Sequence, residues 1–155
     1  MRKKCKRKVW KLINPIKHAI DGASICTDET LAPLQTRELA AIEAFRIGKA
    51  TTQEWSDIVN MMNVTEHMAF RGVGPEAKQC CHDAYLHLIA AAKRYKTTRK
   101  MGTTGEGLQC FRDLYEWHNL QRTAVSRSEY ERHIQETVNR IRSGAPEVID
   151  AMEVV

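Results

Sequence analysis

Apolar side chains recur at helical spacing between residues 36 and 47. Leu39, Ile42 and Phe45 follow one another at intervals of three residues, which predicts one apolar face on a helix over about 36–47. Gly48 suits the end of that helix, because glycine adopts a left-handed backbone at no steric cost. The pattern therefore indicates an amphipathic helix with a defined stop.

A second helix is predicted from Thr51 to about residue 71. Thr51 followed by Glu54 is typical of a capping box, in which each side chain bonds the other residue's backbone N–H. The predicted inner face consists of Trp55, Ile58, Val59, Met62 and Ala69. Gly72 and Gly74 indicate the turn that ends this helix.

A third helix is expected over about 75–96, with Pro75 in its first turn, where the missing N–H costs least. Its predicted inner face is made largely of small residues: Ala77, Cys81, Ala84, Leu88, Ala92 and Tyr95. Residues 97–105 are rich in threonine and glycine and form the one long loop that we expect.

Two further capping signals follow. Thr103 with Glu106 predicts a fourth helix with a face of Leu108, Phe111, Leu114, Tyr115, His118 and Val125. Ser126 with Glu129 predicts either a fifth helix or a kink in one long helix at residues 124–128. The face expected beyond that point is Tyr130, Ile134, Val138 and Ile141.

These elements predict an all-α fold, a single helical bundle of four or five antiparallel helices. Residues 9–33 are expected to form a short helix near 15–21 and an irregular connector. Because they lie on the inner faces of different helices, Trp55, Phe111 and Ile134 should share one core.

Charge divides the chain into three parts. The net charge is +5, yet residues 1–11 carry seven positive side chains and no acid, so the remainder carries −2. We expect residues 1–11 to be a disordered basic arm, 12–144 the bundle domain and 145–155 an acidic-apolar tail.

The arm is the strongest local signal for a partner. Closely spaced lysines and arginines neutralise phosphates without reading sequence, and a following tryptophan can stack on a base. The predicted nucleic-acid contacts are Arg2, Lys3, Lys4, Lys6, Arg7, Lys8 and Trp10 in the arm, with a second basic cluster at Lys93, Arg94, Lys96, Arg99 and Lys100. Both clusters also have interpretations without a nucleic-acid partner. The arm is then a tail that increases solubility, and the second cluster compensates the dipole of the helix that it ends.

Composition indicates a cytoplasmic protein. Apolar residues make up 43% of the chain, no apolar run is long enough to span a membrane, and the basic start lacks the apolar stretch of a signal peptide. The five cysteines are an odd number in a chain that needs no disulfide, so we expect free thiols that mostly fill the core.

No metal ion, cofactor or catalytic residue is predicted. The metal-capable side chains Cys80, Cys81, His82, Asp83 and His87 lie within one helix and lack the spacing of structural zinc ligands. Glu66 and His118 both fall on inner helix faces, where a polar group needs a partner. We therefore expect them to form a buried structural pair rather than a catalytic one.

Several short motifs between Asn14 and Glu147 resemble a family of small uncharacterised helical proteins encoded by phages, prophages and plasmids of proteobacteria. They are Asn14-Pro15-Ile16, residues 44–51, 63–66, 72–77 and 104–109, and the spacing Glu116-x-His118-x-x-Gln121. The resemblance implies a helical fold, a mobile-element origin and a bacterial host cell, and brings no activity with it.

The functional hypothesis is a non-enzymatic accessory protein whose basic arm contacts nucleic acid or a nucleoprotein complex. The alternative is a protein-binding module or inhibitor that engages a host protein through a face of the bundle. A third hypothesis is a small metal- or histidine-dependent enzyme. Salt-dependent binding of DNA or RNA would favour the first hypothesis, a stable protein partner without nucleic acid the second, and stoichiometric zinc the third. The sequence leaves the oligomeric state open.

Overall fold

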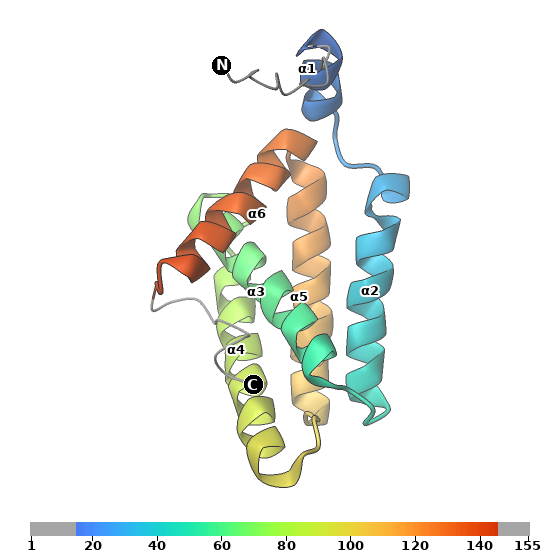
Figure 1. Cartoon of the computed structure of the whole chain (residues 1–155), viewed down its shortest axis with the longest axis vertical. Helices are drawn as coiled ribbons and strands as arrows, with labels where there is room; N and C mark the ends of the chain where they lie inside the picture. Colours follow the sequence, from blue (N-terminus) through green and yellow to red (C-terminus); the bar gives the residue numbers. More distant parts are fainter. Residues whose placement is uncertain (1–14, 146–155) are drawn as a thin grey trace, which may run out of the picture.

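The computed structural model describes residues 15–145, and Figure 1 shows an antiparallel arrangement of long helices. The helices are α1 (Pro15–Ala23), α2 (Asp28–Arg46), α3 (Thr52–Phe70), α4 (Ala77–Thr98), α5 (Gly105–Ala124) and α6 (Arg127–Arg142). Within residues 15–145 the extended pairing is limited to an isolated bridge between Ile25 and Ser126. The predicted all-α class is confirmed, whereas the proposed arm and most of the acidic tail lie outside the described residues.

Helices α2 to α5 form a four-helix bundle. Each of them packs against two neighbours, α3 also packs against α5, and α6 lies across the bundle mainly against α3 and α1 (Figure 1). The main core contains Trp55 and Phe111, both fully buried, as predicted. Ile134 is half-buried against a second, smaller cluster that includes Met68 and Tyr130, so its predicted place in one shared core is wrong.

Helix α2 begins at Asp28, well before the start predicted at about residue 36. Its first turn is capped by threonines, because the backbone N–H of Thr27 donates to Thr30 Oγ1 at 3.1 Å. Pro33 lies inside the helix rather than in a connector. Its position in the second turn loses one backbone hydrogen bond without ending the helix. Leu39, expected on the inner face, is 48% exposed.

The predicted capping box of α3 is confirmed. The backbone N–H of Thr51 donates to Glu54 Oε2 at 2.8 Å, and Thr51 Oγ1 accepts from the N–H of Gln53 at 3.2 Å. The inner face is also as predicted, with Trp55, Ile58, Val59, Met62 and Ala69 all buried. The indole of Trp55 donates to the carbonyl oxygen of Leu88 at 2.9 Å, which fixes α3 against α4.

The helix starts that follow differ slightly from the predictions. Pro75 lies in the turn before α4 rather than in its first turn. Thr104, and not Thr103, caps α5, since its Oγ1 accepts from the N–H of Gly107 at 3.1 Å. Helix α5 ends at Ala124, and Val125 has an extended backbone, so α5 and α6 are two separate helices. Ser126 caps α6, because its Oγ accepts from the N–H of Glu129 at 3.3 Å.

Candidate functional site

The second basic cluster forms one end of the bundle. It comprises five exposed cations on the last turns of α4 and in the segment that follows: Lys93, Arg94, Lys96, Arg99 and Lys100. Arg99 ends the helix in a left-handed conformation with φ of 57°, and its guanidinium lies 5.7 Å from the ring centre of Tyr95. We call these five side chains the basic end.

The basic end is not neutralised by acidic side chains of the described chain. None of its five cations forms an ion pair there, although several other arginines do, for instance Arg37 with Asp57 and Arg127 with Glu131. The helix dipole accounts for part of the cluster, because it favours cations within the last turn. Lys93 and Arg94 precede that turn, so the dipole does not account for them.

The described chain begins at the end of the bundle away from the basic end. Arg2, Lys3, Lys4, Lys6, Arg7, Lys8 and Trp10 lie outside the described residues. The described chain begins in α1, which lies at the opposite end from the segment joining α4 to α5 (Figure 1). The basic end and the start of the described chain therefore lie at opposite ends of the bundle.

His118 is buried as predicted, but its partners differ. Nδ1 shares a hydrogen bond with Thr65 Oγ1 at 2.8 Å, and Nε2 shares one with the Tyr130 hydroxyl at 2.9 Å. α3 and α5 do face one another, yet the helical turn places Thr65 at the histidine, whereas Glu66 lies near Cys81. The carboxylate beside His118 is that of Glu38, at 3.8 Å from Nε2, so the predicted Glu66–His118 pair is corrected.

A buried ion pair continues this network. Arg122 is fully buried, and its guanidinium donates to both carboxylate oxygens of Glu38, at 3.1 and 2.8 Å. Burial raises the pKa of Glu38 against the opposing effect of Arg122. Burial, assisted by the charge of Arg122, lowers the pKa of His118 to about 3. These groups link α2, α3, α5 and α6 and have the character of a structural network.

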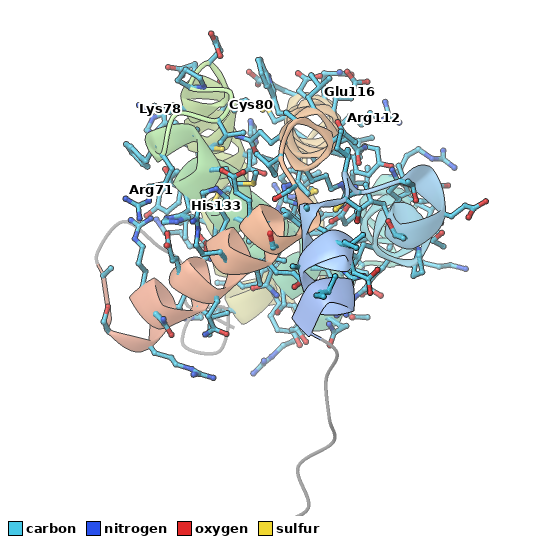
Figure 2. The ribbon with its side chains drawn as sticks, turned by 90° about the horizontal axis from the view of Figure 1, so that it is seen from above. Arg71, Lys78, Cys80, Arg112, Glu116 and His133 are labelled. Carbon is cyan, nitrogen blue, oxygen red and sulfur yellow. The ribbon has the colours of Figure 1, made fainter. Side chains whose placement is uncertain are left out.

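The metal-capable residues of α4 do not converge. Cys81 is buried in the core, His82 is exposed and His87 packs against α5. Cys80 lines a groove of about 520 Å³ between α4 and α5 that is also lined by Cys110 and acidic side chains. Figure 2 labels Cys80 on α4 and one of these acids, Glu116, on α5. Burial raises the pKa of Cys80 to about 12, and nearby acids act in the same direction. Cys26, Cys80, Cys81 and Cys110 are free thiols, as predicted, and Cys5 lies outside the described residues.

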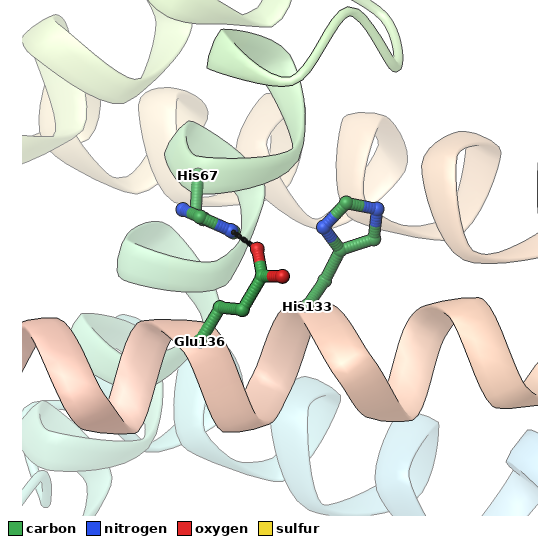
Figure 3. Close-up of side chains that lie close together, drawn as sticks. All are labelled: His67, His133 and Glu136. Atoms are coloured by element: carbon green, nitrogen blue, oxygen red, sulfur yellow. Dashed lines mark hydrogen bonds and ion pairs between the residues drawn. The ribbon is translucent and has the colours of Figure 1, made fainter.

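A cluster that the sequence did not predict lies between α3 and α6. His67 from α3 meets His133 and Glu136 from α6, and the Glu136 carboxylate lies between the two imidazole rings (Figure 3). His67 Nε2 is 2.9 Å from Glu136 Oε2, and the ring centres of the two histidines are 5.5 Å apart. We call these three residues the histidine cluster.

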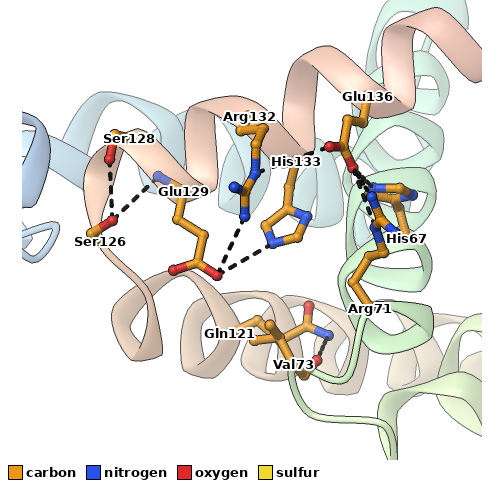
Figure 4. Close-up of polar contacts among 10 residues, drawn as sticks. All are labelled: His67, Arg71, Val73, Gln121, Ser126, Ser128, Glu129, Arg132, His133 and Glu136. Carbon is orange, nitrogen blue, oxygen red and sulfur yellow. Dashed lines mark hydrogen bonds and ion pairs between the residues drawn. The ribbon is translucent and has the colours of Figure 1, made fainter.

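Charged groups surround the histidine cluster (Figure 4). Arg71 donates to Glu136 Oε2 at 3.1 Å, and Arg140 Nη1 lies 3.2 Å from His67 Nδ1. Hydrogen bonds from His67 and Arg71 lower the pKa of Glu136. Burial, reinforced by His67, lowers the pKa of His133. The arrangement thus keeps an ionised carboxylate beside two imidazoles.

The prediction from the sequence missed the histidine cluster, because α6 buries a different face from the one predicted. Tyr130, His133 and Thr137 are buried, whereas Ile134, Val138 and Ile141 are only half-buried. Ranking positions by hydrophobicity selects the isoleucine and valine face. A usable signal was the His133-x-x-Glu136 spacing, which places both side chains on one side of a helix.

Comparison of the chain with protein-family models, curated proteins and solved structures finds no match. The resemblance to a family from mobile elements of proteobacteria therefore stays a prediction. Within the part of the chain that the structure describes, no helix is both long and apolar enough to cross a membrane.

Proposed function

We propose that this protein is a non-enzymatic binding protein whose basic segments contact the phosphate backbone of nucleic acid or a nucleoprotein. The observation that supports the proposal is the basic end, where Lys93, Arg94, Lys96, Arg99 and Lys100 are exposed and form no ion pair within residues 15–145. Cations that are not already neutralised are free to replace counterions on a polyanion.

The charge distribution supports the same proposal. The whole chain carries +5, residues 1–11 carry +7 and residues 93–100 carry +5, so all other residues together carry −7. A protein with positive charge concentrated in two segments attracts a polyanion to those segments and repels it elsewhere. Because phosphate contacts carry no sequence information by themselves, the binding should have little sequence preference.

Three charge variants test the proposal by fluorescence anisotropy with labelled DNA duplexes and single strands. The arm variant changes Lys3, Lys4, Lys6, Arg7 and Lys8 to alanine, and the basic-end variant changes Lys93, Arg94, Lys96, Arg99 and Lys100 to glutamine. A control removes five exposed cations from other surfaces, namely Arg37, Lys78, Arg112, Arg127 and Arg132. Affinity should fall by at least about tenfold in the first two variants and much less in the control. Equal losses in all three would show that only net charge matters.

The alternative function is a protein-binding module or inhibitor of a host protein. It is favoured by three isoleucines on and just after α1, Ile16, Ile20 and Ile25, which are 70%, 65% and 64% exposed. A pull-down from host lysate with and without nuclease separates the two functions. A partner that survives nuclease treatment, together with no measurable affinity for DNA or RNA, would favour the alternative.

A further inference from the structure

The histidine cluster brings together three metal-capable side chains from two helices. Their ligand atoms all lie within 4.8 Å of one another, although His67 is far from His133 and Glu136 in sequence. His67 and His133 are buried and Glu136 is half-buried. No hydrophobic driving force favours placing two imidazoles and a carboxylate at a helix interface, so the arrangement requires a specific reason.

His133 supplies the second observation. The residue is 3% exposed, and neither of its ring nitrogens has a hydrogen-bond partner among the described residues. The Glu129 carboxylate is 4.0 Å from Nε2, which is too long for a hydrogen bond. Native proteins rarely leave a buried polar side chain unsatisfied, and an ion is one of the few explanations when they do. One His133 nitrogen faces the Glu136 carboxylate (Figure 3).

The donor set matches a particular class of ion. Two imidazoles and one carboxylate are the protein ligands of many zinc sites, and the same set binds ferrous iron. Zinc bonds of about 2.0–2.2 Å would place tetrahedral ligands roughly 3.4 Å apart. Ligand atoms that lie up to 4.8 Å apart must therefore come closer, while His67 Nε2 and Glu136 Oε2, now 2.9 Å apart, must separate slightly. His67 and Glu136 also line a surface pocket of about 660 Å³, which leaves space for a further ligand such as water.

Two arginines that contact the histidine cluster affect how it could bind a metal ion. Arg140 donates to His67 Nδ1 at 3.2 Å, so Nε2 carries the proton that His67 donates to Glu136. A metal ion on Nε2 needs that lone pair, so the proton must move to Nδ1 and Arg140 must withdraw. Arg71 remains beside Glu136 and orients the carboxylate, as outer partners of metal ligands commonly do.

We propose that His67, His133 and Glu136 bind a divalent transition-metal ion, with Zn²⁺ the best match, and that the ion fastens α6 to α3. The ion replaces the Nε2 proton as the partner of Glu136 and gives the His133 ring a partner that the described part of the chain does not supply. This inference goes beyond the proposed nucleic-acid contact and does not depend on it.

Titration of the reduced full chain with Zn²⁺ and with Co²⁺ tests the proposal. We expect one ion per chain, with a Co²⁺ spectrum typical of nitrogen and oxygen ligands and no thiolate charge-transfer band. His133→Gln should weaken binding by at least about 100-fold, since losing even an outer partner costs 10–100-fold. Because His133 makes no side-chain hydrogen bond within residues 15–145, this variant should fold, and circular dichroism checks that it does. Glu136→Gln provides a second ligand variant of the same size.

His82→Gln is the matched control, because His82 is an exposed histidine on α4. The Cys80→Ser/Cys110→Ser double variant tests the thiols of the acidic groove as an alternative site. Both controls should bind as tightly as wild type. Undiminished binding in His133→Gln, loss of binding in the cysteine variant, or no saturable binding at millimolar metal would each overturn the proposal.

Arg140→Gln distinguishes a metal site from a merely structural cluster. Removing this cation frees His67 Nδ1 and removes a repulsive charge, so metal affinity should rise several-fold. Zn²⁺ should raise the thermal midpoint of wild type and of Arg140→Gln, but not that of His133→Gln. Weaker binding in Arg140→Gln would contradict the assigned ligand atom of His67 and overturn the proposed geometry.

Discussion

Gly107 of α5 lies in close contact with His87 of α4 and Thr103. A Cβ atom at this position would be 2.1 Å from Thr103 Oγ1 and 2.8 Å from Nδ1 of His87. Gly105, in the same turn of α5, has no neighbouring atom within 4 Å of an added Cβ. The two glycines thus differ in their surroundings but share a helix.

Gly107→Ala should lower the free energy of unfolding by about 1–3 kcal/mol, because the clash forces the His87 ring and Thr103 to move. Helix propensity alone predicts the opposite sign, a gain of up to about 1 kcal/mol. Gly105→Ala is the control and should be neutral or slightly stabilising. Urea denaturation of both variants measures the difference, and equal effects would mean that the close approach is not rigid.

The Arg122–Glu38 pair should show strong coupling. Arg122→Met leaves the Glu38 carboxylate half-buried without its bidentate partner, so the variant should lose about 3–5 kcal/mol. Adding Glu38→Gln should restore part of that loss, which a double-mutant cycle measures. The exposed pair Arg127–Glu131 is the control, with an expected coupling of about 1 kcal/mol or less. Additive effects at Arg122 and Glu38 would contradict the network.

His118 should make stability depend on pH. Its pKa falls from 6.5 in the unfolded chain to about 3 in the folded protein, where burial and Arg122 oppose protonation. Between these values the unfolded state binds more protons, so stability is lost as the pH falls through this window. His118→Gln should therefore show a shallower loss between pH 6.5 and 4 in urea unfolding. Parallel pH profiles for the variant and wild type would show that His118 is not kept neutral.

Helix boundaries followed from the sequence where capping residues marked them. Thr51 with Glu54 and Ser126 with Glu129 both lie at helix starts. Pro33 misled the prediction for α2, because proline in a second turn costs one hydrogen bond, while packing of the helix beyond it outweighs that loss. Local signals therefore located most elements, and tertiary packing decided the exception.

The candidate sites were predictable to different degrees. The basic end is continuous in sequence, so charge counting found it. The histidine cluster depends on how α6 rotates against α3, and that rotation buries His133 and Thr137 instead of the more apolar Ile134 and Val138. The periodicity of apolar residues favours the apolar face, and it contains no information on the polar contacts that hold α6 against α3. For the same reason it placed Ile134 in the main core.

The polar character of the α3–α6 interface predicts that α6 opens before the rest of the bundle. Elements with few buried apolar contacts exchange through low-energy local openings. In native-state hydrogen exchange, amides of α6 should be less protected than those around Trp55 in α3 and Leu114 in α5, both fully buried. Metal-free protein is the required sample. Equal protection of α6 and α3 would mean that the bundle unfolds as one unit.

At the scale of the whole molecule, the basic end and the start of the described chain in α1 lie at opposite ends of a rod-like bundle (Figure 1). Helix α4 has 22 residues, which corresponds to a length of about 33 Å. A duplex covers that distance in roughly ten base pairs. A duplex longer than this therefore spans the distance between the basic end and α1, where the described chain begins.

The salt dependence of affinity for a duplex of about 25 base pairs tests the central claim most directly. Each phosphate contact contributes about −0.9 to the slope of log K against log salt concentration. Wild type should show a slope of roughly −5 or steeper. Replacing the five cations of the basic end by glutamine should make the slope shallower by about 2 or more, and the control variant should leave it unchanged. An identical slope for the basic-end variant and wild type would contradict the assignment of this surface to nucleic acid.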